Sequence, residues 1–198
     1  DNSVEACVAV FATLKAGAVF VLVNPTAKRG KLAYVLKDTE ARALITDSPR
    51  LPTVAGCGAD LRSVPVRVLA CRESGPPTPV DGFLPYAGLL ARYASCDKPP
   101  PCRTIDIDVA ALIYTSGSSG TPRGVMCTHR SMVAAATSIA SYLRNTDADI
   151  ILNMLPLSFD YGLYQLLMAL HAGATLVQVY SGLIYRGPAL IAGPRVLV

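Results

Sequence analysis

The sequence predicts an α/β fold in which helices flank a mostly parallel sheet, and three observations predict it. Helical and strand-like segments alternate from the first residues onward, as in chains built from strand–helix–strand units. The strand-like segments are short, apolar and bounded by Asn, Gly or Pro, which is typical of buried parallel strands. Apolar residues make up 52% of the 198 residues, and only 16% are charged, against about 25% in average proteins. Such a chain can bury enough apolar surface to fold, so disorder is excluded.

The first fifty residues contain two predicted helices and two predicted strands. Asn2 is the predicted cap of the first helix, and Glu5 three residues later would complete a capping box. A strand is predicted over residues 19–23, a second helix over 31–37 and a second strand over 43–46. This order favours parallel strands joined by right-handed crossovers.

The rest of the chain continues the alternation around a Pro-rich interruption. Pro-rich segments at 74–79 and 98–101 lack amide donors and bracket a surface excursion, which we interpret as a loop without function. Further strands are predicted at 64–69, 109–114, 150–154 and 175–179, and further helices at 86–93, 131–143 and 163–171.

Charge and cysteine usage exclude several classes of protein. The net charge of +4 comes from scattered residues, and the densest basic run spans only residues 28–31, so we expect neither nucleic acid nor a lipid surface as a partner. The six cysteines contain no close pair of the kind that a zinc site needs. We therefore expect reduced, mostly buried thiols in a cytoplasmic protein, with no metal site.

Residues 161–185 carry no charge and exceed the length that a bilayer requires. The run is interrupted by Gly173, which follows a helix-like segment and precedes a strand-like one. A helix, a glycine stop and a buried strand are typical of an α/β core. We therefore expect no membrane span.

The segment from Tyr114 to Val125 carries the strongest chemical signal of the chain. Its three glycines let the backbone approach a ligand closely, and its Ser and Thr hydroxyls, its amides and Arg123 can bind an anion. A strand that leads into such a loop is a usual place for a nucleotide phosphate. The predicted ATP-phosphate ligands are Thr115, Ser116, Gly117, Ser118, Ser119, Gly120, Thr121, Arg123 and Gly124.

Several known loops do not match this segment. The Walker and dinucleotide-binding patterns fail on their glycine spacing, and the hydrolase elbow fails because Gly120 directly follows Ser119. The Gly-Ser-Ser-Gly run is similar to the nucleophile loop of amidases, which would need an upstream Lys reaching Ser118 or Ser119. A flexible surface loop is the remaining alternative.

Three ordered segments resemble the AMP-forming acyl-activating enzymes, which include acyl-CoA synthetases, peptide-synthetase adenylation domains and luciferases. Residues 114–125 resemble their phosphate loop, with Arg123 in place of the usual Lys, and residues 128–131 also fit. Residues 14–21 resemble the "Leu-Lys-Ala-Gly" strand entry, and residues 155–162 resemble the acyl-pocket segment. The resemblance implies part of the large N-terminal domain over residues 1–179, followed by a poorly matching tail at 180–198.

The resemblance implies a ligase that uses ATP to convert a carboxylic acid to acyl-AMP and pyrophosphate. The acyl group would then pass to coenzyme A or to the pantetheine of a carrier protein. Family members also use Mg²⁺, but the Glu that holds it, the ribose-binding Asp and the catalytic Lys belong to family segments that this sequence does not contain. We therefore expect no catalytic residue within these 198 residues, and no activity of the chain alone.

The resemblance also places a substrate pocket at Phe159, Asp160 and Tyr161. In amino-acid-activating relatives, the Asp of a Phe-Asp pair receives the substrate ammonium, but the residues after Asp160 depart from the peptide-synthetase pattern. We favour a substrate that is not an amino acid and keep the amino-acid reading as an alternative. A noncatalytic, nucleotide-binding remnant is a further hypothesis.

Overall fold

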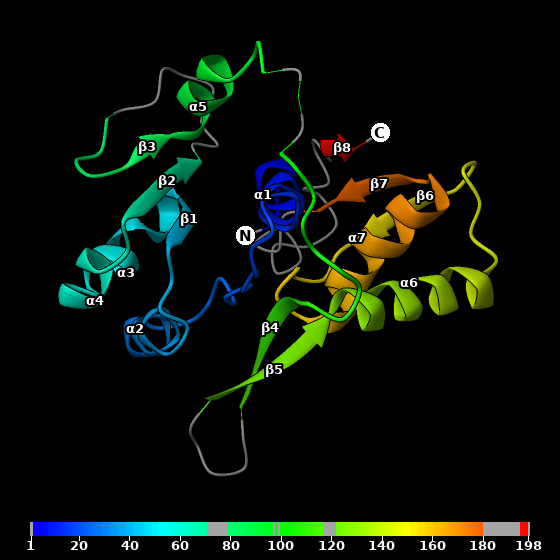
Figure 1. Ribbon diagram of the computed structural model, residues 1–198, viewed down its shortest axis with the longest axis horizontal. Coiled ribbons are helices and arrows are strands. Elements are labelled where there is room, and N and C mark those ends of the chain that lie inside the picture. Colours follow the sequence, from blue (N-terminus) through cyan, green and yellow to red (C-terminus); the bar gives the residue numbers. More distant parts are fainter. Residues whose placement is uncertain are drawn as a thin grey trace, which may run out of the picture. The chain divides into compact units, whose positions relative to one another are not determined.

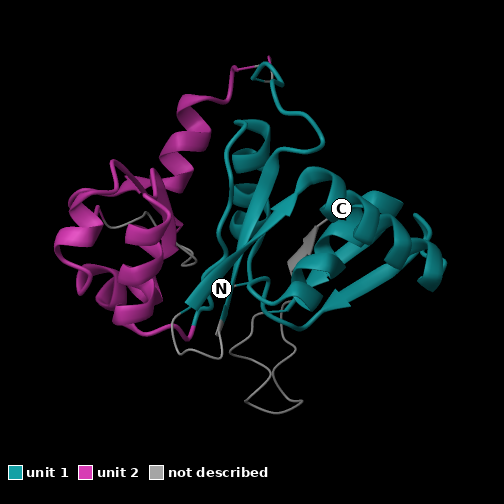
Figure 2. Ribbon diagram, turned by 60° about the horizontal axis from the view of Figure 1, so that its bottom comes forward, with its two compact units in different colours: residues 1–25, 100–198 teal, residues 26–99 magenta. Residues whose placement is uncertain are grey.

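A computed structural model describes residues 2–70, 79–96, 98, 100–116, 122–179 and 195–197. The chain forms two compact units, one of residues 1–25 and 100–198 and the other of residues 26–99 (Figure 2). The polypeptide therefore leaves the first unit after its N-terminal helix and returns to it after the Pro-rich region.

The unit of residues 26–99 contains a three-stranded parallel sheet with the order β1-β2-β3 (Figure 1). Pro65 precedes its central strand rather than lying within it, which suits a residue that cannot donate to a ladder. The strands are β1 (Ala43–Asp47), β2 (Val66–Ala70) and β3 (Leu84–Pro85). The helices are α2 (Arg29–Asp38), η1 (Ser48–Arg50), α3 (Leu51–Ala55), α4 (Ala59–Arg62) and α5 (Tyr86–Arg92). Each element predicted in the described part of this unit is present.

The larger unit contains an antiparallel hairpin and a second sheet. Strands β4 and β5 form the hairpin, β6 and β7 are parallel, and β8 pairs antiparallel with β7. The strands are β4 (Val109–Ser116), β5 (Pro122–Thr128), β6 (Ile150–Asn153), β7 (Thr175–Gln178) and β8 (Arg195–Leu197). The helices are α1 (Val4–Lys15), α6 (His129–Leu143) and α7 (Asp160–Ala172).

The predicted strand at residues 19–23 is reduced to a single bridge. The Phe20 amide donates to the Ala110 carbonyl at 3.1 Å, and the Phe20 carbonyl accepts from the Leu112 amide at 3.0 Å. The Phe20 ring is buried while Val19 is exposed. The segment is therefore held at Phe20 alone, by two backbone hydrogen bonds and by the buried ring. The prediction of a full strand over residues 19–23 is wrong.

Two neighbouring core clusters hold the larger unit together, and α1 and α7 contribute to both. Cys7 of α1 and Leu166 of α7 pack with Leu176 of β7 in one cluster. Val10 of α1 and Leu163 of α7 pack in the other, with residues from β4 and α6. The three-residue offsets on each helix turn successive apolar side chains toward the two clusters. Helices α1 and α7 therefore join the hairpin to the second sheet.

The ends of the helices show one correction and one agreement. Ser3, not Asn2, caps α1, because its hydroxyl accepts from the Ala6 amide at 3.1 Å. The predicted capping box is wrong, since the third residue after the actual cap is Ala6. Gly173 ends α7 with φ at +72°, a left-handed conformation that suits glycine and agrees with the predicted stop.

None of the helices in the described residues has the length and apolarity needed to cross a membrane.

The cysteines are less uniformly buried than the sequence predicts. Cys7 and Cys57 are buried and Cys127 is half-buried, but Cys96 and Cys102 are exposed. All five are free thiols, and burial raises the pKa of Cys7 to about 11, so this thiol stays protonated at neutral pH. The prediction of mostly buried thiols is therefore wrong for Cys96 and Cys102, and Cys71 lies outside the described residues.

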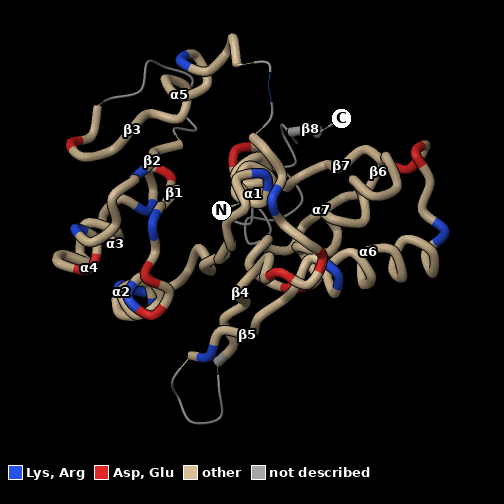
Figure 3. The backbone as a smooth tube through the Cα atoms, viewed as in Figure 1, with Lys and Arg blue, Asp and Glu red and all other residues tan. Residues whose placement is uncertain are grey.

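Charged residues are mixed rather than clustered by sign. Figure 3 shows Lys and Arg interspersed with Asp and Glu along the described tube of both units. Within those same residues, no three His, Cys, Asp or Glu side chains are grouped so that they could hold a metal ion.

Candidate functional site

The β4–β5 hairpin carries the predicted phosphate loop (Figure 1). Gly117, Ser118, Ser119, Gly120 and Thr121 lie outside the described residues. The ends of the loop are set by ladder pairs, because Thr115 lies opposite Arg123 and Ser116 lies opposite Pro122. Thr115 and Arg123 are both exposed. Two of the predicted phosphate ligands are therefore brought together at the loop end of the hairpin, on neighbouring strands.

Strand β5 was not predicted from the sequence, which was interpreted there as a loop leading into a helix. Its first residues, Pro122, Arg123 and Gly124, have low β-propensity. The strand forms because it pairs with β4 over the whole hairpin. The phosphate loop therefore joins two antiparallel strands instead of leading directly from a strand into a helix.

Gly124 makes room for an aromatic ring on the neighbouring strand. It pairs with Tyr114, and a Cβ atom built on it would lie 3.3 Å from Cζ, 3.4 Å from Cε2 and 3.5 Å from the hydroxyl of that ring. The first of these spacings is tighter than nearly all Cβ contacts in proteins. Gly124 thus lets the Tyr114 ring lie across β5, directly beside the predicted phosphate ligands.

We expect Gly124→Ala to destabilise the chain by about 1 kcal/mol, because the added methyl group must displace the Tyr114 ring. Urea denaturation measures the free energy of unfolding of this variant, of Tyr114→Ala and of the double variant. We expect the double variant to lose less stability than the sum of the two single variants, because removal of the ring also removes the clash with the added methyl group. Gly30→Ala is the control, because no atom lies within 4 Å of a Cβ built there. Strictly additive effects of the two hairpin substitutions would contradict the contact.

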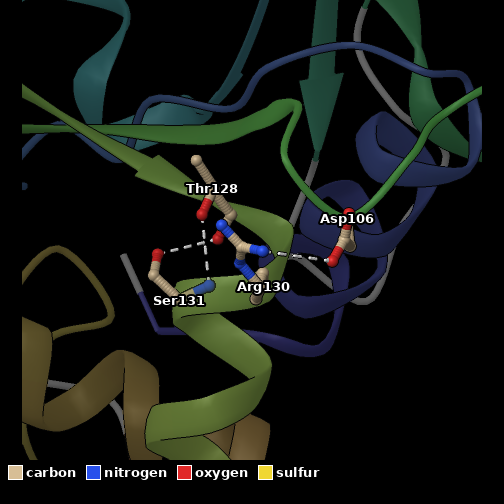
Figure 4. A network of polar contacts seen from close by, with 4 residues as sticks. All are labelled: Asp106, Thr128, Arg130 and Ser131. Atoms are coloured by element: carbon tan, nitrogen blue, oxygen red, sulfur yellow. Dashed lines mark hydrogen bonds and ion pairs between the residues drawn. The ribbon is translucent and has the colours of Figure 1, made fainter.

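Residues 128–131, which fit the family resemblance, form the start of α6 (Figure 4). The Thr128 hydroxyl accepts from the Ser131 amide at 3.2 Å, and the Ser131 hydroxyl donates to the Thr128 carbonyl at 2.9 Å. Arg130 lies 3.9 Å from the Asp106 carboxylate, with both side chains more than 60% exposed, so this ion pair adds little stability. The Arg130 amide also donates to the Asp106 carbonyl at 2.7 Å. These contacts show that residues 128–131 form the N-terminal cap of α6.

The predicted substrate-pocket residues lie together at the start of α7. Phe159 is the N-cap residue, with extended backbone, and Asp160 and Tyr161 occupy the first turn. Asp160 accepts from the Tyr161 amide at 2.8 Å, a position where a helix dipole favours a carboxylate. Phe159, Asp160 and Tyr161 are all exposed. Their side chains are therefore available to a ligand.

Tyr164 is a neighbouring residue that is not among the site residues predicted from the sequence. It follows Asp160 by four residues, so both lie on one face of α7. Burial, and then the nearby Cys127 and Asp160, raise the pKa of the Tyr164 hydroxyl. This hydroxyl therefore remains a hydrogen-bond donor at neutral pH. The four-residue spacing was the signal that could have identified it.

The backbone beneath this turn is packed very closely. Gly162 is buried, and a Cβ built on it would lie 2.7 Å from the Leu155 carbonyl oxygen and nearer still to that of Pro156. Asn153, which is fully buried, donates from Nδ2 to the Gly162 carbonyl at 3.0 Å and to Gln178 at 3.2 Å. The β6–α7 connection is thus held against the first turn of α7 by backbone contact and by a buried amide.

A protein-family model for AMP-binding enzymes matches residues 1–187. The match covers most of the chain, and the chain therefore belongs to the AMP-binding enzyme family. The fold is the one expected for the N-terminal region of an adenylate-forming enzyme.

Two curated relatives are a synthase and a synthetase. The chain is 30% identical over 190 residues to N-(5-amino-5-carboxypentanoyl)-L-cysteinyl-D-valine synthase of Penicillium rubens, covering 92% of this chain and 4% of the relative. It is 33% identical over 193 residues to phosphinothricin tripeptide synthetase PhsC of Streptomyces viridochromogenes, covering 96% of this chain and 16% of the relative. The chain therefore spans only a small part of the curated relatives that it matches.

Two solved structures share the fold. The anthranilate CoA ligase AuaEII in complex with anthranoyl-AMP has a TM-score of 0.77 at 24% identity, over 87% of this chain and 32% of that chain. ATP-bound MatB from Rhodopseudomonas palustris has a TM-score of 0.64 at 25% identity, over 88% of this chain and 32% of that chain. The likeness to AuaEII is a likeness of fold alone.

Proposed function

We propose that this chain forms the phosphate-binding part of an adenylate-forming acid–thiol ligase. The ligase would convert ATP and a carboxylic acid to acyl-AMP and pyrophosphate, and would then transfer the acyl group to coenzyme A or to a carrier pantetheine. The observation that carries the proposal is the hairpin, which brings Thr115 and Arg123 together at the two ends of the Gly- and Ser-rich loop. Membership of the AMP-binding family and the likeness to ATP-bound MatB support ATP as the nucleotide.

The proposed role of the loop is to position the triphosphate while pyrophosphate leaves. Residues 115–121 would donate from amides and hydroxyls to the β- and γ-phosphates, since a loop of this composition binds anions well. Arg123 would add positive charge in a planar, forked geometry that differs from that of the usual Lys. This arrangement contributes by orientation and by charge stabilisation, which dominate catalysis of transfer at phosphorus.

The family also implies Mg²⁺, which nucleotide sites usually hold through one or two carboxylates together with the phosphates. Among the described residues, no three His, Cys, Asp or Glu side chains are grouped, so the ligands of this ion are proposed to come from ATP and from the full-length protein.

The proposed acid site is the exposed first turn of α7, with Phe159 and Tyr161 as apolar walls and Asp160 beside them. Two substrate classes are consistent with this site. A fatty or aryl acid would contact the two rings, and the residues after Asp160, which depart from the peptide-synthetase pattern, support this class. An amino acid would place its ammonium at Asp160. The synthase and the tripeptide synthetase that are 30% and 33% identical to this chain support that class. With an amino acid as substrate, a carrier protein is the proposed thiol partner.

The test is carboxylate-dependent exchange of labelled pyrophosphate into ATP, measured on the full-length protein with a panel of fatty, aryl and amino acids. We expect exchange either with amino acids or with fatty or aryl acids, and not with both classes. If amino acids are used, Asp160→Ala should raise their KM by at least about tenfold, because the charge pair is lost. If a fatty or aryl acid is used, the same variant should change its KM little. The absence of exchange with every acid would overturn the ligase and would favour a noncatalytic remnant.

A further inference from the structure

The side chain of Asn2 reaches a segment more than 150 residues away in the sequence. Its Nδ2 atom donates to the Leu155 carbonyl at 2.8 Å and to the Val179 carbonyl at 3.2 Å. Its Oδ1 atom accepts from the Leu157 amide at 2.9 Å. Asn2 is only 4% exposed, so these bonds form away from competing water. One buried amide thus joins the start of α1, the β6–α7 connection and the residue after β7.

The two bonds to Leu155 and Leu157 flank Pro156 and fix the backbone from both sides. Two further backbone bonds extend this order toward α7, since the Phe159 amide donates to Pro156 at 3.0 Å and the Leu163 amide donates to Phe159 at 2.9 Å. The chain of contacts from Asn2 therefore ends at the turn that carries Phe159, Asp160 and Tyr161.

The side chains of that turn cannot fix its position by packing alone. Phe159 is 50% exposed and Tyr161 is 67% exposed, so neither ring is held by the core. Asp160 is also exposed. The turn is therefore held by its backbone and by its buried neighbours Leu157 and Leu163. Asn2 is a buried side chain that binds the backbone just before the turn.

We propose that Asn2 is a positioning residue for the acid-binding turn at Phe159–Tyr161. The inference rests on the proposed function, because it assigns the acid to that turn. Asn2 touches no reacting atom. It holds the β6–α7 connection in one conformation, so that binding an acid does not have to order the turn.

The test compares Asn2→Asp with Ser3→Ala in the full-length protein. Asn2→Asp keeps the shape of the side chain but removes both donors and places a carboxylate against two carbonyl oxygens. Ser3→Ala is a matched control at the next residue, since it removes the cap of α1 and leaves the bonds of Asn2 in place. Asn2→Ala is the second variant, because it removes all three bonds of the Asn2 side chain, the one accepted from the Leu157 amide included, without introducing a buried charge.

Hydrogen exchange is the first measurement. We expect the Phe159 amide to exchange at least about tenfold faster in both Asn2 variants than in Ser3→Ala, and the Leu157 amide to do so in Asn2→Ala, which removes its acceptor. The Ala174 and Thr175 amides, which bond to Ala169 and Asp149 at the other end of α7, should exchange equally in all three variants. Equal exchange at Leu157 and Phe159 in all three variants would overturn the positioning role, whatever reaction the protein catalyses.

Kinetics of acid-dependent pyrophosphate exchange are the second measurement. The expected result for the Asn2 variants is a rise of at least about tenfold in the KM of the acid, with the KM of ATP within about twofold of wild type. A loss of stability alone, as in Ser3→Ala, would lower the amount of active protein but would not change the KM of the acid relative to the KM of ATP. Equal changes in both constants would overturn the inference. A wild-type protein without any acid-dependent exchange would instead overturn the proposed function, together with the acid-binding part of this inference.

Discussion

A Gly162→Ala variant is expected to lose about 3 kcal/mol of folding stability, a large effect for one methyl group. The added Cβ would lie 2.7 Å from the Leu155 carbonyl oxygen and 2.8 Å from the Pro156 carbonyl carbon, and nearer still to the Pro156 oxygen. These atoms belong to the backbone, so no side-chain rotation can relieve the overlap. The β6–α7 connection would have to move away from α7, which strains the bond from Asn153 to the Gly162 carbonyl.

Urea denaturation of Gly162→Ala and of Gly30→Ala measures this effect. Gly30 lies in α2 with no atom within 4 Å of a Cβ built on it, so alanine there should be neutral or slightly stabilising. The same chemical change thus has opposite expected signs at the two positions. Equal free energies of unfolding for the two variants would show that the close approach at Gly162 is not maintained.

A Gly120→Val variant of the full-length protein is expected to lose acid-dependent pyrophosphate exchange by at least about a thousandfold, which corresponds to about 4 kcal/mol of transition-state stabilisation. The physical reason is that a branched Cβ prevents the backbone from closely approaching a phosphate and disfavours positive φ angles. Gly120 lies outside the described residues, so this expectation comes from the glycine pattern of the loop and from the proposed function.

The measurement pairs exchange kinetics with ATP binding, and Gly30→Val is the control for the cost of a branched side chain at a glycine. The control should retain exchange, because Gly30 lies outside the hairpin. Near-normal ATP affinity and turnover in Gly120→Val would remove the phosphate-binding assignment of the loop. A loss of stability large enough to unfold the variant would be visible in its urea denaturation curve and would be separated from a loss of binding.

Local patterns in the sequence determined most of the helices and most of the strands. The apolar run at residues 175–179 predicts β7, because a short β-branched segment after a glycine stop has few alternatives in an α/β chain. The apolar spacing within residues 131–143 predicts α6, and Gly173 predicts the end of α7. The Gly- and Ser-rich composition after residue 116 predicts a loop at the end of β4. In each case, the deciding interactions lie within a few residues of one another.

Tertiary structure decided what depends on partners far away in the chain. Strand β5 begins with residues of low β-propensity and forms because β4 pairs with it, whereas the predicted strand at 19–23 keeps only the Phe20 bridge. Asn2 has the sequence signature of a helix cap, yet Ser3 is the cap, and Asn2 instead binds Leu155, Leu157 and Val179. A cap is chosen by amides three residues away, which the sequence displays. The partners of a buried side-chain amide are the backbone groups that the packed core leaves without another hydrogen bond. Which groups these are depends on how α1, the β6–α7 connection and β7 come together.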